Sequence, residues 1–459
     1  MPRGTPARCQ QTRTGFREII KLAVPVSLEA VFQTSLGLVD QVIVGFLGAG
    51  AVAAVGLSNS VSFVIMLAYS AVGTGTGVLV AQAFGRNDIQ EVSKIAAVGQ
   101  MFAATCGACT AIPLVLFPAV ILHWVEPQQQ VASVASPYFQ LFAASAPFTV
   151  TSAVTVATFR SLSDTRTPMV ITIAAVALNT VLGYLLVLGI PPFPKLQVLG
   201  AGVAALSTQA LRCAALLTAL YCLRTGLRWR WPWHYAGYGK VFRLLFEVTY
   251  PLALSEFLWG ISAFAYTIVF ARLGTAALAS SQIVMTVENL VVVAASGLAP
   301  AAVALIGQAI GGDSIVRAKQ QAGAVLRLGS FAGLLFTALL SGASFSLPII
   351  YPNVGKEVIS FAFWGLLIVA FVQPAKVLNG ILGNGILPSG GDTKFVLLSH
   401  LIGSYLVGLP CAVLSGVFMG LNLWGVYGSR CAEEIIKLIL FLVRFRSPKA
   451  FRSEIRKDF

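Results

Sequence analysis

Long apolar stretches alternate with short polar, basic or glycine-rich breaks along the whole chain. Most stretches exceed the roughly 18 residues that mark a candidate membrane-spanning helix, so the pattern predicts a polytopic membrane protein. Turn-forming residues mark the breaks, as in Gly85-Arg86-Asn87-Asp88 and Gly390-Gly391-Asp392. We expect twelve spans, over residues 19–47, 51–82, 95–122, 136–160, 168–190, 198–223, 244–271, 277–310, 324–350, 358–387, 395–419 and 423–443.

The composition narrows the class of protein further. Of the 459 residues, 57% are hydrophobic and only 10% are charged, whereas soluble domains carry about 25% charged residues. A soluble enzyme, a disordered protein and a collagen-like rod are therefore excluded. The chain has no phosphate-loop, metal-ligand or nucleophile motif. We therefore expect an all-α membrane protein that is not an enzyme and that uses neither a cofactor nor a metal.

The positive charges are distributed unevenly between the two sides of the membrane. If the twelve spans are threaded in order, 24 of the 31 Lys and Arg residues fall on one side and three on the other. The positive-inside rule makes the basic side cytoplasmic, which places both termini there. We expect a cytoplasmic tail over 1–18, with a targeting remnant as the alternative, a loop over 226–243 and a basic tail over 444–459.

Because topology accounts for the formal charge of +14, we expect a lipid bilayer and no nucleic acid as a partner. The plasma (inner) membrane is the expected location, with an organelle membrane as the alternative. We expect a monomer.

An internal repeat appears when the numbering is shifted by 226. Pro25 then falls on Pro251, and the motif Gln82-Ala83-x-Gly85 falls on Gln308-Ala309-x-Gly311. Matched proline, glycine and glutamine residues carry more weight than matched apolar residues, because they fall at helix kinks and ends.

The repeat predicts two pseudo-symmetric bundles of six helices, over 19–225 and 244–443. An even number of spans in each half makes this a parallel repeat, a plan typical of transporters that work by alternating access. Pro25 and Pro251 are candidate hinges, since proline removes a hydrogen bond from the helix interior.

Ionisable side chains within a membrane are costly, so each one is a candidate for function. The acidic candidates are Glu29, Asp40, Glu256 and Glu288. Glu29, Gln33 and Asp40 share one face of the first span, because 11 residues make about three helical turns. A carboxyl group removed from water binds a proton more readily, and it can also neutralise a cation. Further polar candidates are Tyr138, Asn179, Thr208 and Asn379.

Two acids in the last span carry a different expectation. Glu433 and Glu434 lie within about one helical turn of Arg430 and Lys437. Side-chain pairs at this spacing on a helix are usually structural.

Several longer motifs carry a family resemblance. They are the run from Leu38 to Gly48, Ala81-Gln82-Ala83-Phe84-Gly85, the segment from Phe159 to Pro168, Asn179-x-x-Leu182 and the segment from Ser389 to Lys394. With these motifs, nearly the whole chain resembles the multidrug and toxic compound extrusion (MATE) family of the polysaccharide-flippase superfamily.

The resemblance implies two six-helix lobes in a V, and export of organic cations or related amphipathic compounds in exchange for H⁺ or Na⁺. Asp40 matches the family's cation-coupling aspartate, and Tyr138, Asn179 and Thr208 match polar positions around it. The sequence departs from the pattern at Gly183, where many members carry a second aspartate, and at Ser161, where many carry glycine. Hard cations prefer several oxygen ligands, so the missing carboxylate favours H⁺ over Na⁺.

Three other classes of function fit the sequence less well. A lipid-linked precursor flippase of the same superfamily would need a large basic groove, whereas few cations lie within the spans. A facilitator of the major facilitator fold should carry a different motif between spans 2 and 3. A membrane enzyme should show clustered Asp or His ligands at an interface. We therefore expect a secondary active antiporter for multidrug efflux, with the flippase as the alternative.

Overall fold

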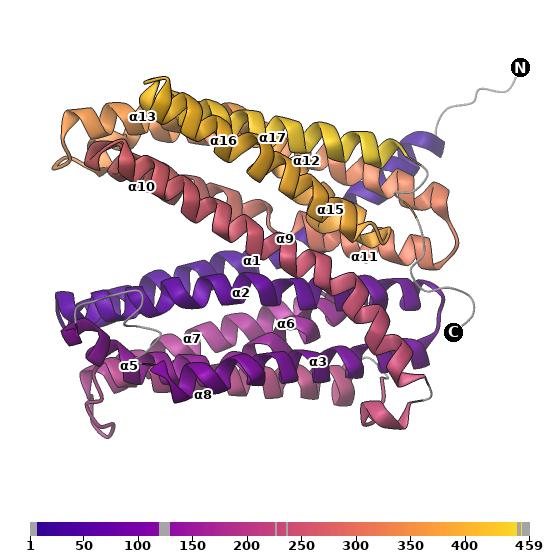
Figure 1. The fold of residues 1–459 in the computed structure, drawn as a ribbon. Helices are drawn as coiled ribbons and strands as arrows, with labels where there is room; N and C mark the ends of the chain where they lie inside the picture. Colours follow the sequence, from indigo (N-terminus) through magenta and orange to yellow (C-terminus); the bar gives the residue numbers. More distant parts are fainter. Residues whose placement is uncertain (1–6, 119–128, 225–226, 236, 448–450, 452–459) are drawn as a thin grey trace, which may run out of the picture. The chain divides into compact units, whose positions relative to one another are not determined.

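The computed structural model describes residues 7–118, 129–224, 227–235, 237–447 and 451, and this part of the chain is helical without a β-strand (Figure 1). The long helices are α1 (Ala7–Gly45), α2 (Ala49–Gly85), α3 (Ile89–Leu116), α5 (Gln129–Ala144), α6 (Ala146–Ser161), α7 (Arg166–Leu188), α8 (Val198–Thr218), α9 (Tyr238–Arg272), α10 (Thr275–Val292), α11 (Leu298–Gly311), α12 (Ile315–Ile350), α13 (Lys356–Ile381) and α17 (Asn422–Arg446). The shorter helices are α14 (Leu387–Ser389), α15 (Thr393–His400) and α16 (Leu409–Ala412).

Short segments of other helix types extend several of these elements. The π-helical segments are Ala219–Arg224, Leu382–Ile386, Leu401–Gly408 and Val413–Phe418, and the 3₁₀ segments are Pro232–His234 and Val293–Ala295. Segments of π-helix are frequently found at functional sites, and one of them takes part in a polar network described below.

Nine helical segments of the described chain are long and apolar enough to cross a membrane, or ten if the bent pair α5 and α6 is one span. Large apolar side chains such as Phe264, Phe371 and Ile349 are exposed on these helices, as expected where a surface faces lipid. The helices α2 and α17 coincide with the predicted second and twelfth spans but are not among the nine. The count of twelve spans therefore stays a prediction.

The chain divides into two compact units, and two helices contribute to both. Among the described residues, unit 1 comprises 7–27, 250–447 and 451, and unit 2 comprises those between 28 and 249. The division falls within α1, between Ser27 and Leu28, and within α9, between Thr249 and Tyr250. In this division the beginning of α1 belongs with the second half of the sequence, and the two lobes over 19–225 and 244–443 stay a prediction.

The backbone repeats at the same interval as the sequence. Gly48 and Gly274, which are 226 residues apart, both adopt positive φ angles, of 103° and 112°. Asn87 and Asp313, also 226 apart, have φ angles of 61° and 55°. These residues end equivalent helices, since α3 begins at Ile89 and α12 begins 226 residues later. The internal repeat predicted from the sequence is thus confirmed in the turn geometry of both halves.

The beginning of α1 is anchored in the core of unit 1. Ile19, Leu22 and Ala23 are buried among apolar side chains of α11, α12 and α13. The backbone N–H of Gly297, just before α11, donates to Ser27 Oγ at 3.2 Å. A Cβ atom at position 297 would lie 2.1 Å from the Ala23 carbonyl oxygen. A glycine is therefore required where this turn meets α1.

We predict that Gly297→Ala destabilises the protein by about 1–3 kcal/mol, because the added methyl group forces α1 away from the turn. Thermal unfolding of the purified protein in detergent measures the effect. Gly323→Ala is the matched control, since a Cβ atom there meets no other atom within 4 Å and alanine favours the helix. Equal melting temperatures for Gly297→Ala and the wild type would contradict the close packing of α1.

Candidate functional site

In unit 2, three polar side chains from different helices form a chain that begins at Asp40. Asn179 on α7 donates from Nδ2 to Asp40 Oδ1 at 3.2 Å. The Thr208 hydroxyl on α8 lies 3.0 Å from Asn179 Oδ1 and 2.7 Å from the Ala204 carbonyl oxygen, and it shares its single hydrogen between them. Since Asn179 Oδ1 accepts from Thr208, the amide presents its N–H group to the carboxylate.

The surroundings of Asp40 are partly closed to solvent. Asn179 and Thr208 are each only 4% exposed, whereas Asp40 itself is half-buried. Tyr138 on α5 is buried in an apolar cluster with Val44 and Val198, and it is close enough to Asp40 for an electrostatic interaction. The structure therefore gathers three of the residues named from the sequence, Asn179, Thr208 and Tyr138, near the carboxyl group of Asp40.

Asp40 is unusual among the acids of the spans because its hydrogen-bonding partner is a neutral amide. No Lys, Arg or His of the described chain forms an ion pair with it. Glu256 on α9 also lacks an ion pair: it is half-buried, and no hydrogen bond or ion pair joins it to another described residue. A carboxyl group without a fixed counter-cation can be neutralised by a proton or by a mobile cation.

Glu29 lies in a different environment, although it shares the polar face of α1 with Asp40. Its carboxylate pairs with Arg160 of α6 at 2.8 Å and with Arg212 of α8 at 3.5 Å. The Thr172 hydroxyl of α7 donates to it at 2.9 Å, and only 1% of Glu29 is exposed. The carboxylate thereby ties α1 to α6, α7 and α8, and its charge is already compensated. Gln33, four residues further along α1, is exposed.

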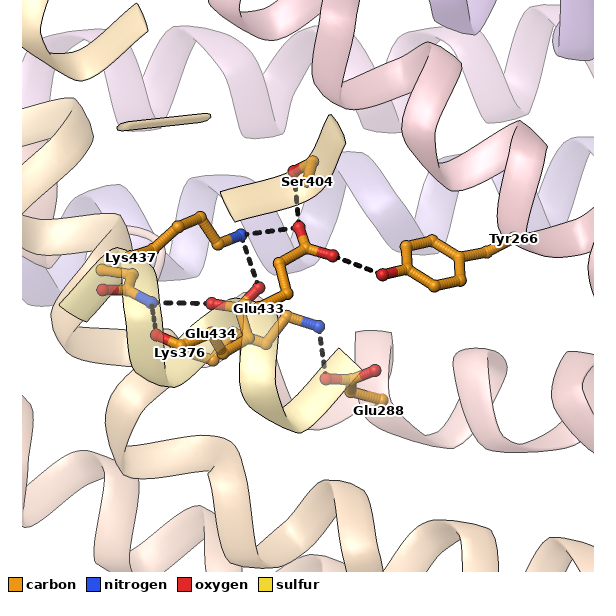
Figure 2. A network of polar contacts seen from close by, with 8 residues as sticks. Tyr266, Glu288, Lys376, Ser404, Glu433, Glu434 and Lys437 are labelled. Carbon is orange, nitrogen blue, oxygen red and sulfur yellow. Dashed lines mark hydrogen bonds and ion pairs between the residues drawn. The ribbon is translucent and has the colours of Figure 1, made fainter. Parts of the chain in front are cut away.

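In unit 1, Glu288 of α10 is also paired (Figure 2). Lys376 Nζ of α13 lies 2.5 Å from Glu288 Oε1. Gln373 Nε2 donates to the same oxygen at 2.6 Å. Asn379, one turn further along α13, donates to Glu434 Oε2 at 2.7 Å. The structure therefore places Glu288 and Asn379 in polar contacts with fixed protein partners.

Sequence reasoning missed the partners of these acids. Arg212 and Lys376 stand out in the sequence as cations within apolar spans, but nothing in the sequence shows which acid each one meets. Arg160 and Thr172 carry no signal of this kind. Among the described residues, no group of three His, Cys, Asp or Glu side chains is arranged to hold a metal ion.

Comparison with known proteins relates this chain to membrane transporters. The family model MatE matches residues 25–185 and 251–414, one segment in each half of the repeat. "Probable multidrug resistance protein NorM" of Thermotoga maritima is 26% identical over 441 residues, which cover 94% of this chain and 92% of the relative. "Uncharacterized transporter YisQ" of Bacillus subtilis is 24% identical over 433 residues, with 94% of each chain covered.

Solved structures show the same fold. A MOP superfamily transporter from Pyrococcus furiosus superposes with a TM-score of 0.86 at 18% identity, over 97% of this chain and 98% of the other. The Vibrio cholerae MATE transporter VcmN in its bent form gives a TM-score of 0.86 at 19% identity, over 97% and 99%. These likenesses confirm the predicted all-α membrane fold.

We predict that Glu29→Gln destabilises the protein by about 3–5 kcal/mol, because it leaves two arginine charges without their carboxylate. Unfolding in detergent measures the loss. Glu247→Gln is the matched control: Glu247 pairs with Arg243 at 3.0 Å, but both side chains are exposed, so its loss costs less than about 1 kcal/mol. If both variants unfold like the wild type, Glu29 is not a structural ion-pair centre.

Proposed function

Because the chain belongs to the MatE family, as its motifs predict, we propose that it is a secondary active antiporter for multidrug efflux. It is a multi-pass integral membrane protein of a transporter family. In our proposal it exports organic cations or related amphipathic compounds in exchange for H⁺, with both termini in the cytoplasm. The names of its relatives support drug export as the process, and the geometry of unit 2 supports ion coupling.

Asp40 carries the proposal. A half-buried carboxyl group that has no fixed cation can bind either a proton or a positively charged guest, but it neutralises only one of them at a time. Protonation of Asp40 from outside then favours release of the substrate. Loss of the proton leaves the carboxylate ready to bind the next substrate molecule. Coupling follows only if the two loaded forms favour different conformations of the transporter. Asn179 and Thr208 are the positioning residues for the carboxylate in this scheme.

The oxygen ligands near Asp40 favour H⁺ over Na⁺. Asn179 turns its N–H group toward Asp40, and its Oδ1 is engaged by Thr208. Position 183, one turn further along α7, is glycine and supplies no second carboxylate. A hard cation would therefore find few oxygens at this site, whereas a proton needs only the carboxylate.

The two hinge candidates lie where the helices pass from one compact unit to the other. Pro25 lies two residues before the division in α1, and Pro251 lies just after the division in α9. Each proline leaves the carbonyl group four residues earlier without its helical donor. We propose that bending at these two positions accompanies alternating access.

The flippase alternative finds little support in the charges of the spans. A lipid-linked precursor would require unpaired basic side chains to hold its phosphates. In the described chain, Arg212 pairs with Glu29, Lys376 with Glu288, and Lys437 with two glutamates. These cations already have protein partners, so they are not free to form a basic groove.

We predict that Asp40→Asn abolishes most of the substrate flux that a pH gradient drives in liposomes, because an amide neither takes up a proton nor neutralises a cation. Glu247→Gln, which removes an exposed carboxylate from a surface pair, should retain this flux. Undiminished pH-driven flux in Asp40→Asn would refute the assignment of Asp40.

We also predict that the wild type responds to a pH gradient but not to a Na⁺ gradient, and that Gly183→Asp adds a Na⁺-dependent component. A Cβ atom at position 183 meets its nearest neighbour, Ala204, only at 4.0 Å. Gly183→Asn is the matched control, because it has the same size without the charge. A wild type driven by Na⁺ at constant pH would overturn the choice of proton.

A further inference from the structure

Three exposed tryptophan side chains follow one another at every second position of the segment 227–235, which lies between α8 and α9 and is called the tryptophan loop below. Trp229, Trp231 and Trp233 are 43%, 54% and 59% exposed. The ring centroids of Trp229 and Trp231 are 6.1 Å apart. Those of Trp231 and Trp233 are 4.9 Å apart, with the ring planes only 13° from parallel. The three rings therefore form a row that the described part of the chain leaves largely uncovered.

The row begins at the end of a membrane-spanning helix. The ring of Trp229 lies 5.2 Å, centroid to centroid, from that of Tyr221. Tyr221 belongs to the π-helical segment Ala219–Arg224, which extends the candidate span α8. The Tyr221 hydroxyl donates to Gln100 Oε1 of α3 at 2.6 Å, and Gln100 Nε2 donates to Thr155 Oγ1 of α6 at 3.1 Å. These polar contacts hold the first ring of the row beside the end of the span.

The rest of the tryptophan loop is held close to the beginning of α3. Leu227 is only 2% exposed, and the 3₁₀ segment Pro232–His234 lies against α3. A Cβ atom at Gly237 would lie 3.5 Å from Nζ of Lys94, in the second turn of α3. The next candidate span, α9, begins one residue after Gly237. The loop therefore stays at the ends of three membrane-spanning helices of unit 2.

The charges on the tryptophan loop are all positive. The sequence contains no Asp or Glu from residue 165 to residue 246. Arg228 and Arg230, which alternate with the tryptophans, are exposed. No ion pair joins either arginine to an acid of the described chain. Glu91 of the neighbouring helix α3 is paired with Lys94 at 3.2 Å. The loop thus combines an uncovered aromatic row with two arginines that lack an anionic partner.

This combination fits the headgroup region of a lipid bilayer. Tryptophan is enriched at membrane–water interfaces, because its ring is apolar and its indole N–H donates a hydrogen bond. Arginine binds phosphate oxygens with two parallel hydrogen bonds, and basic segments beside a span attract anionic lipids. In water the row would be an exposed hydrophobic patch. An acidic protein would also complement the charge, but lipid is the partner that surrounds the ends of membrane-spanning helices.

We propose that the tryptophan loop is a binding site for anionic phospholipid. In this site Trp231 and Trp233 lie among the lipid headgroups, and Arg228 and Arg230 bind the phosphate. The distribution of basic residues between the two sides of the chain assigns the site to the cytoplasmic leaflet. The site is independent of ion coupling, because it shares no residue with the group around Asp40 and requires no transported substrate.

Fluorescence quenching of the full-length protein in phosphatidylcholine liposomes tests the position of the rings. The wild type is compared with Trp231→Phe/Trp233→Phe, so that the difference isolates the emission of these two rings. We expect phosphatidylcholine brominated on its acyl chains to quench this emission. Iodide, present on both sides of the membrane, should quench it only weakly. If brominated lipid does not quench the two rings, the proposal is overturned, and the iodide result then places them in water or inside the protein.

A second measurement tests the choice of lipid. Brominated phosphatidylglycerol and brominated phosphatidylcholine are compared as minor components of otherwise identical liposomes that contain both lipids. We expect the anionic lipid to be enriched about fivefold around Trp231 and Trp233, which makes brominated phosphatidylglycerol the stronger quencher. Arg228→Gln/Arg230→Gln should remove this preference. Equal quenching by the two lipids in the wild type would contradict an anionic site.

A matched control separates the arginines of the loop from the general positive charge of this side. Arg317→Gln/Lys319→Gln also removes two exposed cations, from the beginning of α12, and should keep the preference for phosphatidylglycerol. A preference that survives in Arg228→Gln/Arg230→Gln overturns the role of the loop. Inorganic phosphate at constant ionic strength should leave the preference unchanged. Its loss in phosphate would mean that the site takes the free ion and not the lipid.

Discussion

A charged group inside a membrane protein must be neutralised close by, because neither lipid nor apolar side chains solvate it. In this protein the rule accounts for the positions of most intramembrane charges. Glu29 and Glu288 are each paired with cations from other helices, and Lys437 neutralises two acids of its own helix. Asp40 and Glu256 have no such partner in the described chain. The ion pairs therefore join helices within each compact unit, whereas Asp40 and Glu256 have no fixed counter-charge among the described residues.

The two halves of the repeat share their backbone but not their polar chemistry. Equivalent turns recur at Gly48 and Gly274 and again at Asn87 and Asp313. The polar groups built on that common frame differ, since unit 2 holds Asp40 among neutral partners whereas unit 1 holds a network of alternating acids and bases. A duplicated bundle can diverge in this way because helix packing depends mainly on apolar and small residues. Each half can then change its buried charges without losing its fold, provided that each charge finds a partner.

Continuity of α1 and α9 links the two compact units through the backbone itself. Asp40 lies on α1, whose first turns are buried in the core of unit 1. The contacts of the turn at Gly297 with Ser27 and with the Ala23 carbonyl group hold the beginning of α1 in unit 1.

The sequence by itself determined the helices, the repeat and its turns, because these follow from apolar periodicity and from residues with special backbone preferences. The family motifs also pointed to Asp40, Asn179 and Thr208, which the structure brings together. Only the tertiary structure decided the partners of the remaining acids. Glu29 meets an arginine 131 residues away, and Glu288 meets a lysine 88 residues away. Periodicity states which side chains share a face of one helix, but the facing helix and its rotation are set by packing across the whole bundle.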